Sequence, residues 1–484
     1  MTGGNSTPAL RRLTTLFPPR RQRSNAVNFA VAGAVPCTSA PPRLNSGDPH
    51  LSAGLPFGIA SEARENARLA GGPMYRLPRR QEGVKNVKRN WLATVAGLLF
   101  LVSAIPERAA AQVSYTITDL GTLGGDNSIP YWITNTGEVV GVSDTGQFDA
   151  FGNPVDHAFR WVGGPLQDLQ TLGGNDSSAN GANAEGQAVG IADVTGGSTS
   201  HAVLWQGGTM ADLGALNGPS GFSFAQLVNG SRQVIGASTT ADGTFRGFVW
   251  DRGVMTELGT LGGANSFALG INDRGQVVGI SQVNDIVDPI LGFPDFHGTL
   301  WDHGEMVNLT PGAGADAFNI NNKSQVVGRL LIPDSIEGGV ARAYVWQEGV
   351  LTDLGVPAGD DNSQANSIND NGQIVGAAGV GFIETYAPDR ALLWQNGRLF
   401  DLNTLIPGDS GYHLIVAFDI NARGQIVVCA VQLSTGNIHA AILTPQPSNV
   451  SGAPVAPRTE AAVPALSESA KRLLRFAMAK RNKH

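Results

Sequence analysis

The sequence predicts an all-β protein, a seven-bladed β-propeller with four strands in each blade, and three observations lead to that prediction. The 484 residues include 63 Gly and 27 Pro, and only 15% are charged. This composition indicates short strands joined by tight turns and excludes a coiled coil or a helical bundle. Three sequence markers recur in seven copies. A single predicted strand precedes the first copy, and the last copy lacks its fourth strand.

The repeat is identified by a nine-residue segment, of which INDRGQVVG, ending at Gly279, is the clearest copy. The other copies end at Gly141, Gly190, Gly236, Gly328, Gly376 and Val428, at intervals of 43 to 52 residues. A tryptophan follows in each unit, at Trp161, Trp205, Trp250, Trp301, Trp346 and Trp394, with Leu443 in the seventh place. The third marker is an Asp-Leu pair, at Asp119, Asp168, Asp212, Asp353 and Asp401, with Glu257 and Asn308 as substitutes. Units of about 40 to 50 residues with four short strands are typical of propeller blades.

The first predicted strand of each unit approaches an asparagine, as in SFALGIN, and a turn leads to the second strand, QVVGIS. A loop of variable length precedes the third strand, which ends at the tryptophan, and a glycine-containing turn leads to the fourth. Residues 115–121 have the pattern of a lone fourth strand, whereas the seventh unit stops after its third strand. We therefore expect 115–121 to complete the last blade, which removes two unpaired strand edges.

Charge divides the chain into three parts. Residues 1–111 have a net charge of +10, the predicted propeller of residues 112–447 has −22, and residues 448–484 have +5. A body this acidic repels phosphate backbones, so we expect no nucleic-acid partner. Only Cys429 lies within the predicted propeller, so no disulfide forms inside it. We expect a monomer.

The N-terminal part contains the pattern of an export signal. Lys85, Lys88 and Arg89 precede an apolar run over residues 91–105, which is short for a membrane span, and alanines follow up to Ala111. We predict a signal peptide over residues 74–111 that is cleaved before Gln112, and a secreted, periplasmic or cell-surface location. Met74 would be the true start, with 1–73 a mis-called or disordered extension; the alternative is an uncleaved anchor.

The C-terminal part consists of a Pro-rich linker over residues 448–466 and a basic tail over residues 467–484. The tail could form an amphipathic helix, because Leu473, Leu474, Phe476 and Met478 stand among basic residues. One interpretation is contact with an anionic surface or lipid, and the other is a solvated, weakly ordered end.

The combination of DLGTLGG, INDRGQVVG and HAFRW resembles the HAF-type probable extracellular repeat family of bacteria, whose name stands at His157, Ala158 and Phe159. The resemblance covers residues 115–445. It implies an exported repeat protein and carries over no catalytic residue, because the family's activity is largely uncharacterised.

Some polar positions recur with the blades. Four residues before each tryptophan, or its substitute, stands a histidine or arginine: His157, His201, Arg246, His297, Arg342, Arg390 and His439. The acid seven residues after the tryptophan can meet it diagonally across a hairpin, with Asp119 serving His439. We interpret these pairs, and the tryptophans, as scaffold, because a contact that recurs in every blade belongs to the fold. The alternatives are a ring of metal-binding histidines and a set of sugar-stacking tryptophans.

The asparagines that end the first strands are interpreted as turn-forming residues rather than channel-lining ones. They are Asn183, Asn229, Asn272, Asn321, Asn369 and Asn421.

The loops are the predicted binding surface. In a four-stranded blade, the loop that enters the first strand and the loop between the second and third strands emerge on one face, and variable loops on a rigid scaffold commonly carry binding sites. The predicted ligand-binding residues of this acidic, loop-rich face are Asp126, Asn127, Asn175, Asp176, Asp285, Asp288, Asp360 and Asp361. Such oxygen-rich loops could bind Ca²⁺, although a solvated acidic surface is favoured and no cofactor is expected.

The sequence therefore predicts an exported, non-catalytic scaffold that binds a protein or an extracellular glycan through its loop-rich face. No GxSxG, HExxH or Walker motif occurs in it. The alternative is a secreted glycan-active hydrolase or lyase that uses acidic residues near the channel mouth.

Overall fold

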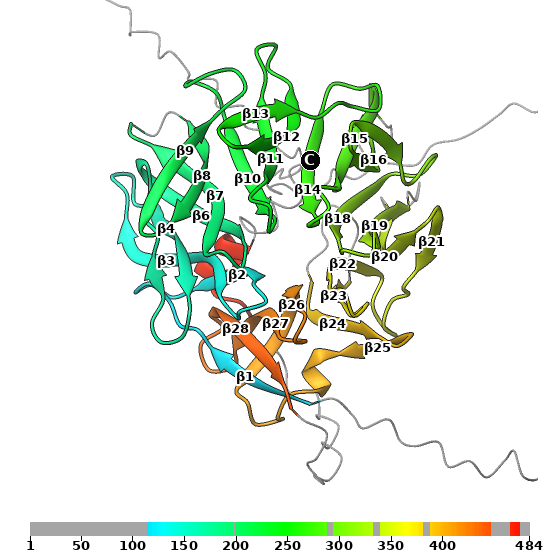
Figure 1. Cartoon of the computed structure of the whole chain (residues 1–484). Helices are drawn as coiled ribbons and strands as arrows, with labels where there is room; N and C mark the ends of the chain where they lie inside the picture. The colour runs from blue at the N-terminus through cyan, green and yellow to red at the C-terminus, as the bar shows by residue number, and fades with distance from the viewer. Residues whose placement is uncertain are drawn as a thin grey trace, which may run out of the picture. The chain divides into compact units, whose positions relative to one another are not determined.

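The computed structural model describes residues 114–196, 199–287, 294–332, 339–380, 388–446 and 465–474. Seven four-stranded antiparallel sheets surround a common axis, so the predicted seven-bladed propeller is confirmed (Figure 1). The predicted extension 1–73 and signal peptide 74–111 lie outside the described residues, as do most of the linker and residues 475–484 of the tail.

Blades 1 to 3 each take four consecutive strands, which run from the axis outward. Blade 1 consists of β2 (Ser128–Ile133), β3 (Val139–Phe148), β4 (Pro154–Trp161) and β5 (Gln167–Asp168). Blade 2 consists of β6 (Gly173–Ala182), β7 (Gln187–Val194), β8 (Ser200–Gln206) and β9 (Thr209–Gly214). Blade 3 consists of β10 (Ser223–Val228), β11 (Val234–Thr239), β12 (Phe245–Asp251) and β13 (Val254–Glu257).

Blades 4 to 6 follow the same plan. Blade 4 consists of β14 (Ser266–Ile271), β15 (Val277–Val287), β16 (Pro294–Asp302) and β17 (Glu305–Asn308). Blade 5 consists of β18 (Ala315–Ile320), β19 (Val326–Ile332), β20 (Val340–Gln347) and β21 (Val350–Asp353). Blade 6 consists of β22 (Asn362–Ile368), β23 (Ile374–Gly379), β24 (Arg390–Gln395) and β25 (Arg398–Asp401). A short 3-10 helix, η1 (Leu402–Thr404), follows β25.

Blade 7 is shared by the two ends of the propeller. It consists of β26 (Tyr412–Ile420), β27 (Ile426–Gln432) and β28 (Ile438–Pro445), with β1 (Tyr115–Asp119) as its outermost strand. β1 pairs antiparallel with β28, from Tyr115 opposite Pro445 to Asp119 opposite Ala441. The predicted closure of the ring by the N-terminal strand is therefore confirmed.

The glycine that ends each repeat segment has a steric cause. A Cβ on Gly279 would lie 2.0 Å from the carbonyl oxygen of Phe267, because the first strand of the blade is bulged opposite it. Blade 7 replaces this glycine with Val428, and there the pairing of β26 with β27 shifts twice rather than once. The altered register accommodates the side chain.

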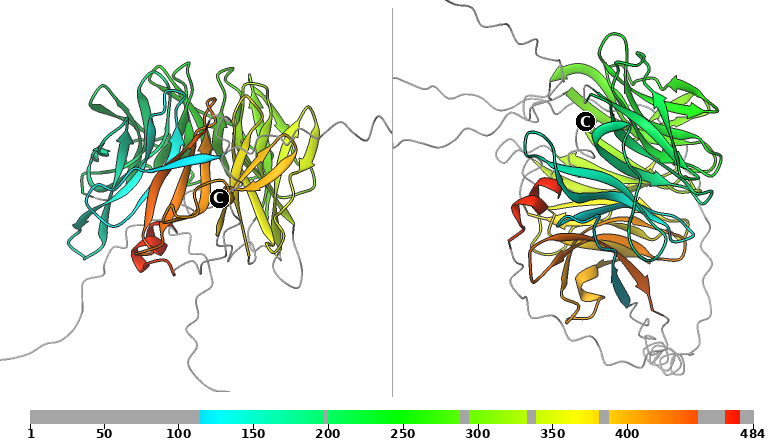
Figure 2. Two further views of the ribbon diagram at one scale, coloured as in Figure 1. Left: turned by 90° about the horizontal axis from the view of Figure 1, so that it is seen from below. Right: turned by 90° about the vertical axis from the view of Figure 1, so that its left-hand side faces the viewer.

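The inner strands are buried on both faces because neighbouring blades cover them. Every residue of β14 is buried, whereas the outer strand β13 is mostly exposed. Hydrophobic clusters accordingly lie between adjacent blades, and one of the largest joins blade 1, blade 7 and a helix formed by residues 468–474. Figure 2 shows this helix, in red, at one face of the ring.

Candidate binding channel

The predicted ligand residues of the loop-rich face lie on separate blades. Asp126 precedes β2 and Asn175 lies in β6, and both are exposed. Asp285 of β15 is also exposed, and its Oδ1 accepts a hydrogen bond from the Ala264 amide at 2.7 Å. Asp288 lies outside the described residues. The predicted ligand residues therefore do not form one cluster in the structure.

Of the other four predicted residues, Asn127, Asp176 and Asp361 link adjacent blades, and Asp360 makes a contact within blade 6. Asn127 is fully buried; its Nδ2 donates to Asp144 at 2.8 Å, and its Oδ1 accepts from the Ile438 amide of blade 7. Asp176 accepts from the Asp156 amide at 2.9 Å. Asp360 is buried beside Arg390, with N and O atoms 3.4 Å apart, and the Asp361 carbonyl accepts from Arg342. These residues have structural contacts of their own.

The recurring histidines each meet the predicted partner across the third and fourth strands. The Nδ1 atoms of His157 and His201 lie 2.9 Å from Asp168 and Asp212. His439 lies 2.8 Å from Asp119, and His297 receives a hydrogen bond from Asn308. Burial opposes ionisation of Asp119, but hydrogen bonds from His439 and Tyr412 lower its pKa to about 2.

The arginine blades differ from the histidine blades. Arg390 pairs with Asp360, Arg342 donates to a backbone carbonyl, and Arg246 donates to the Thr244 hydroxyl. None of the three makes the diagonal pair. The described His, Cys, Asp and Glu side chains include no group of three that could hold a metal ion.

Three of the recurring tryptophans tie a blade to the one before it. The indole N–H groups of Trp205, Trp301 and Trp394 donate to carbonyls of the preceding blade, at Leu169, Gly259 and Leu354, over 2.8 to 3.2 Å. These three tryptophans are buried, whereas Trp161, Trp250 and Trp346 are half-buried. They are part of the packing between blades.

The six asparagines form a ring of hydrogen bonds around the channel that is open between blades 1 and 2, where Thr134 replaces the asparagine. In each blade the Oδ1 caps the turn between the first and second strands, and the Nδ2 donates to the Gln four residues later, as Asn272 does to Gln276. The same Nδ2 also donates to the carbonyl of the corresponding residue in the next blade, over 2.9 to 3.1 Å. The last of these bonds runs from Asn421 to Thr134 of blade 1.

The turn role of these asparagines was expected from the sequence, but the link between blades was not. The turn role was also preferred to a channel-lining one, whereas all six asparagines do both, because they line the cavity at the channel mouth. One feature of the sequence could have indicated the link between blades. Blade 1 lacks the asparagine and the Gln together, because Thr134 and Glu138 occupy the two positions. Their joint replacement indicates that the two side chains act as a unit.

The channel opens widely at the face that carries these turns, which we call the turn face. A cavity of about 330 Å³ lies there, lined by the asparagine ring and by Glu185, Asp273, Asp370 and Asp419. Its described lining contains no lysine or arginine. Between two of these carboxylates, Asn322 Nδ2 lies 3.0 Å from Asp273 and 3.2 Å from Asp370. The mouth is therefore acidic and rich in carboxamides.

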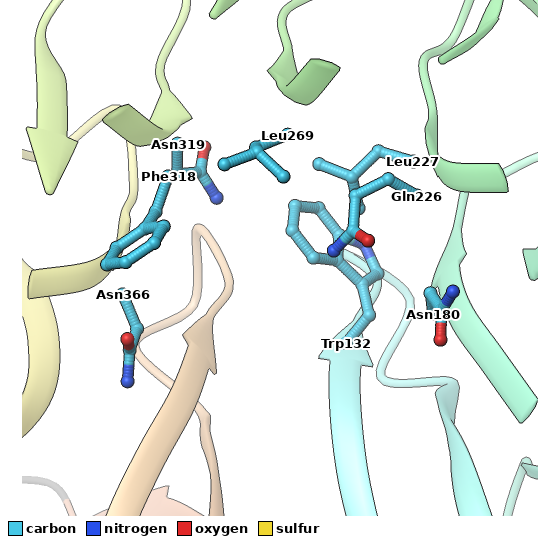
Figure 3. A pocket seen from close by; sticks show the side chains of 8 residues that line it. All are labelled: Trp132, Asn180, Gln226, Leu227, Leu269, Phe318, Asn319 and Asn366. Carbon is cyan, nitrogen blue, oxygen red and sulfur yellow. The ribbon is translucent and has the colours of Figure 1, made fainter. Parts of the chain in front are cut away.

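Deeper in the channel the wall loses its sevenfold regularity. Blades 3, 4 and 5 contribute the apolar side chains of Leu227, Leu269 and Phe318. Blades 2, 3, 5 and 6 contribute carboxamides, and blade 1 contributes an indole, as Figure 3 shows. The residues of this inner site, which we call the channel floor, are Trp132, Asn180, Gln226, Leu227, Leu269, Phe318, Asn319 and Asn366.

Two polar groups of the channel floor are available to a ligand. Asn180 and Asn366 donate to backbone carbonyls of the next blade at 2.8 and 2.9 Å, so their Nδ2 groups are engaged. Gln226 and Trp132 are half-buried, and neither side chain hydrogen-bonds to another described residue. Four of the eight lining residues carry carboxamides and four are apolar or aromatic, and the cavity of the floor itself is only about 20 Å³. A small ligand, which needs several hundred Å³, would therefore occupy the mouth of about 330 Å³ and reach the floor with one end.

A buried polar chain connects the channel wall around the closure. Asn319 donates to Ser367 at 3.2 Å, Ser367 donates to Asp419, and Asp419 accepts from the Ile133 amide at 2.9 Å. This chain joins blades 5, 6, 7 and 1. Trp132 stands directly beside its last member, so the indole is held on a cross-linked part of the wall.

The sequence analysis did not single out Trp132. It is the one tryptophan of the described residues that is out of step with the repeat, two residues before the position of the recurring asparagine. This departure from the repeat could have identified Trp132 as a candidate binding residue.

Apolar side chains protrude from the loops between second and third strands. Phe148 and Phe151 of blade 1 are 66% and 90% exposed, and Ile286 of blade 4 is 74% exposed. Ile332 of blade 5 and Val380 of blade 6 add smaller exposed groups on the same face. None of the described helices is both long enough and apolar enough to cross a membrane.

Solved structures that resemble this chain do so at low sequence identity. No family model and no curated protein matches the sequence. The β-propeller domain of the Trilobed protease from Pyrococcus furiosus matches with a TM-score of 0.45 and 6% identity, over 69% of this chain and 98% of that one. YCF48 bound to D1 peptide matches with a TM-score of 0.39 and 11% identity, over 70% and 97%. TolB from Acinetobacter baumannii matches with 0.33 and 13%, over 66% and 65%. This chain is thus similar to β-propeller proteins.

Proposed function

We propose that this protein is an exported, non-catalytic binding scaffold that holds a glycan chain in its channel, entered from the turn face. The observation that carries the proposal is the irregular wall of the channel floor. Scaffold contacts repeat from blade to blade, whereas the indole of Trp132 occurs once in the wall of this cavity. Gln226 stands at the same repeat position as Asn180 and Asn366, but unlike them it donates to no carbonyl among the described residues of the next blade. Groups that depart from the repeat and are left without a structural partner in the described chain favour a ligand-binding site at the channel floor.

The chemistry of the floor favours a sugar. Indole and aliphatic side chains pack against the C–H face of a pyranose ring, while the indole N–H and a free carboxamide bond its hydroxyl groups. The mouth has four carboxylates and no described cation, which favours a neutral or positively charged glycan over an acidic one. Export to the periplasm or cell surface follows from the predicted signal peptide.

The proposal is tested on a panel of neutral, cationic and acidic oligosaccharides, by calorimetric titration of the mature protein and of Gln226→Leu. This substitution keeps the volume of the side chain and removes its hydrogen-bonding groups. We expect affinity to fall about 2- to 10-fold, the effect of one hydrogen bond. Gln167→Leu, on the exposed outer strand β5, is the matched control and should bind as the wild type does.

Two results would count against this proposal. If Gln226→Leu and Gln167→Leu bind every oligosaccharide equally well, the channel floor is not the site. If any oligosaccharide is cleaved during the titration, the protein is the glycan-active hydrolase or lyase of the alternative prediction, with the carboxylates of the mouth as its first candidates.

A protein partner on the loop-rich face is the second candidate. The exposed phenylalanines Phe148 and Phe151 favour it, because large apolar side chains at loop tips are common in protein interfaces. In a pull-down from the periplasmic or extracellular fraction, a partner of this face would be lost with Phe151→Ser and retained with Gln226→Leu.

A further inference from the structure

The C-terminal helix of residues 468–474 lies on the loop-rich face, across the seam between blades 1 and 7. Ser467 N donates to the carbonyl of Gly436, which lies in the loop between β27 and β28 of blade 7. Arg472 reaches the other side of the seam and contacts two carboxylates of blade 1. The tail therefore bridges the blade that closes the ring and the blade that opens it.

The contact on blade 1 is a pair of like charges with one counter-ion. Asp144 of β3 and Asp156 of β4 stand opposite each other in the sheet, 5% and 3% exposed, and their carboxyl groups are hydrogen-bonded together. Arg472 Nη2 lies 3.0 Å from Asp144, and its Nη1 lies 2.8 Å from Asp156. Two buried carboxylates side by side destabilise a fold unless a cation or a proton offsets them.

The rest of the contact is apolar. Ala470 and Leu473 are fully buried and Leu474 is 9% exposed, in a cluster with core residues of both blades, such as Val142 and Val431. The Ser467 hydroxyl caps the first turn by accepting from the Ala470 amide at 3.1 Å. Three of the seven described residues of the helix are thus buried against the propeller. The helix is consequently stabilised by the surface on which it lies.

We propose that residues 465–474 are a detachable clasp, and that the surface formed by Asp144, Asp156 and the neighbouring apolar residues of the seam is a docking site for a short helix with one arginine and a Leu-Leu pair. The occupant is this chain's own tail. Residues 447–464 tether it, so the segment rebinds after each release. The clasp holds the seam from the loop-rich face, independently of β1, which holds the outer edge of blade 7.

The test compares hydrogen exchange of amides 470–474 in the mature protein and in Arg472→Glu. We expect exchange to be about 10- to 100-fold faster in the variant, because two charge-assisted hydrogen bonds become repulsions. Lys471→Glu is the matched control: it makes the same charge change one residue away, where the ammonium group pairs with the exposed Glu468 at 2.7 Å. Arg472→Lys retains the positive charge but cannot donate to both carboxylates with a planar guanidinium, so its exchange rate should lie between those of the wild type and Arg472→Glu.

A second measurement separates docking from a general loss of stability. A labelled synthetic peptide of residues 465–484 is added to each full-length variant, and its anisotropy is followed. It should bind Arg472→Glu, whose site is vacated, and should not bind the wild type or Lys471→Glu. Equal exchange in Arg472→Glu and Lys471→Glu, or equal peptide binding by all three proteins, would overturn the proposal.

Discussion

At the scale of the residue, one asparagine performs two tasks that the sequence presents as one. The position of Asn272 before an Asp-Arg-Gly turn predicts the capping of that turn. The bond from its Nδ2 to the Asn321 carbonyl, at 3.1 Å, was not predictable, because the acceptor is 49 residues away and belongs to another sheet. The turn role depends on neighbours in sequence, and the link depends on the curvature of the ring.

Replacing Asn272 by Ala should therefore destabilise more than the loss of a surface turn residue. The side chain is 4% exposed, and its removal leaves the Asn321 carbonyl and the Gln276 side chain short of a partner. We expect the free energy of unfolding to fall by about 1–3 kcal/mol, measured by chemical denaturation. Asn175→Ala, on the exposed start of β6, should change it by less than about 0.5 kcal/mol. Equal effects would show that neither the turn cap nor the link between blades contributes to stability.

At the scale of the element, the hairpin of β3 and β4 is the least expected feature of blade 1. Asp144 and Asp156 stand directly opposite each other in the two strands. Such cross-strand positions favour two apolar residues or two opposite charges, and like charges there are destabilising. Burial and the neighbouring Asp156 raise the pKa of Asp144 to about 7, although Asn127 and Arg472 oppose the shift. Asp176 of blade 2 is also near enough to act on Arg472. The basic tail, which the sequence offered as a lipid contact or a free end, supplies the counter-ion in its described part.

This hairpin should make stability depend on pH. An unfolded Asp has a pKa near 4, so between pH 4 and pH 7 the native state binds a proton at Asp144 that the unfolded state has released. The contribution of Asp144 to stability therefore falls as pH rises through this range and is lowest above pH 7. We expect the difference in melting temperature between pH 4.5 and pH 7.5 to shrink in Asp144→Asn. A difference identical to that of the wild type would contradict the assignment.

At the scale of the whole molecule, the ring is closed by the two ends of the propeller. β1 contributes Tyr115, 2% exposed, to the core of blade 7, and Asp119 to a pair with His439. β1 covers the edge of β28 that would otherwise be unpaired. The predicted strand pattern of 115–121 was sufficient to foresee this closure, because the missing fourth strand of the last unit is visible by counting.

Deleting residues 112–121 should consequently lower the melting temperature by more than about 10 °C, since the outer strand, its buried tyrosine and the Asp119–His439 pair are lost together. Differential scanning calorimetry of the mature protein measures the change. Deletion of residues 475–484, the same number from the other end, is the control for chain shortening and should leave the transition in place. An unchanged transition in the first deletion would refute closure by β1.

The sequence by itself determined the number of blades, the order of their strands and the way the ring closes. These properties repeat along the chain, and each copy shows its strands and turns through neighbours a few residues apart. The tertiary structure decided which side chains meet: Trp132 and Gln226 across the channel, and Arg472 beside Asp144, which is 328 residues away. It also divided the predicted acidic face into residues with structural contacts and exposed ones. The reason is that curvature of the ring and burial bring together positions that no spacing in the sequence relates.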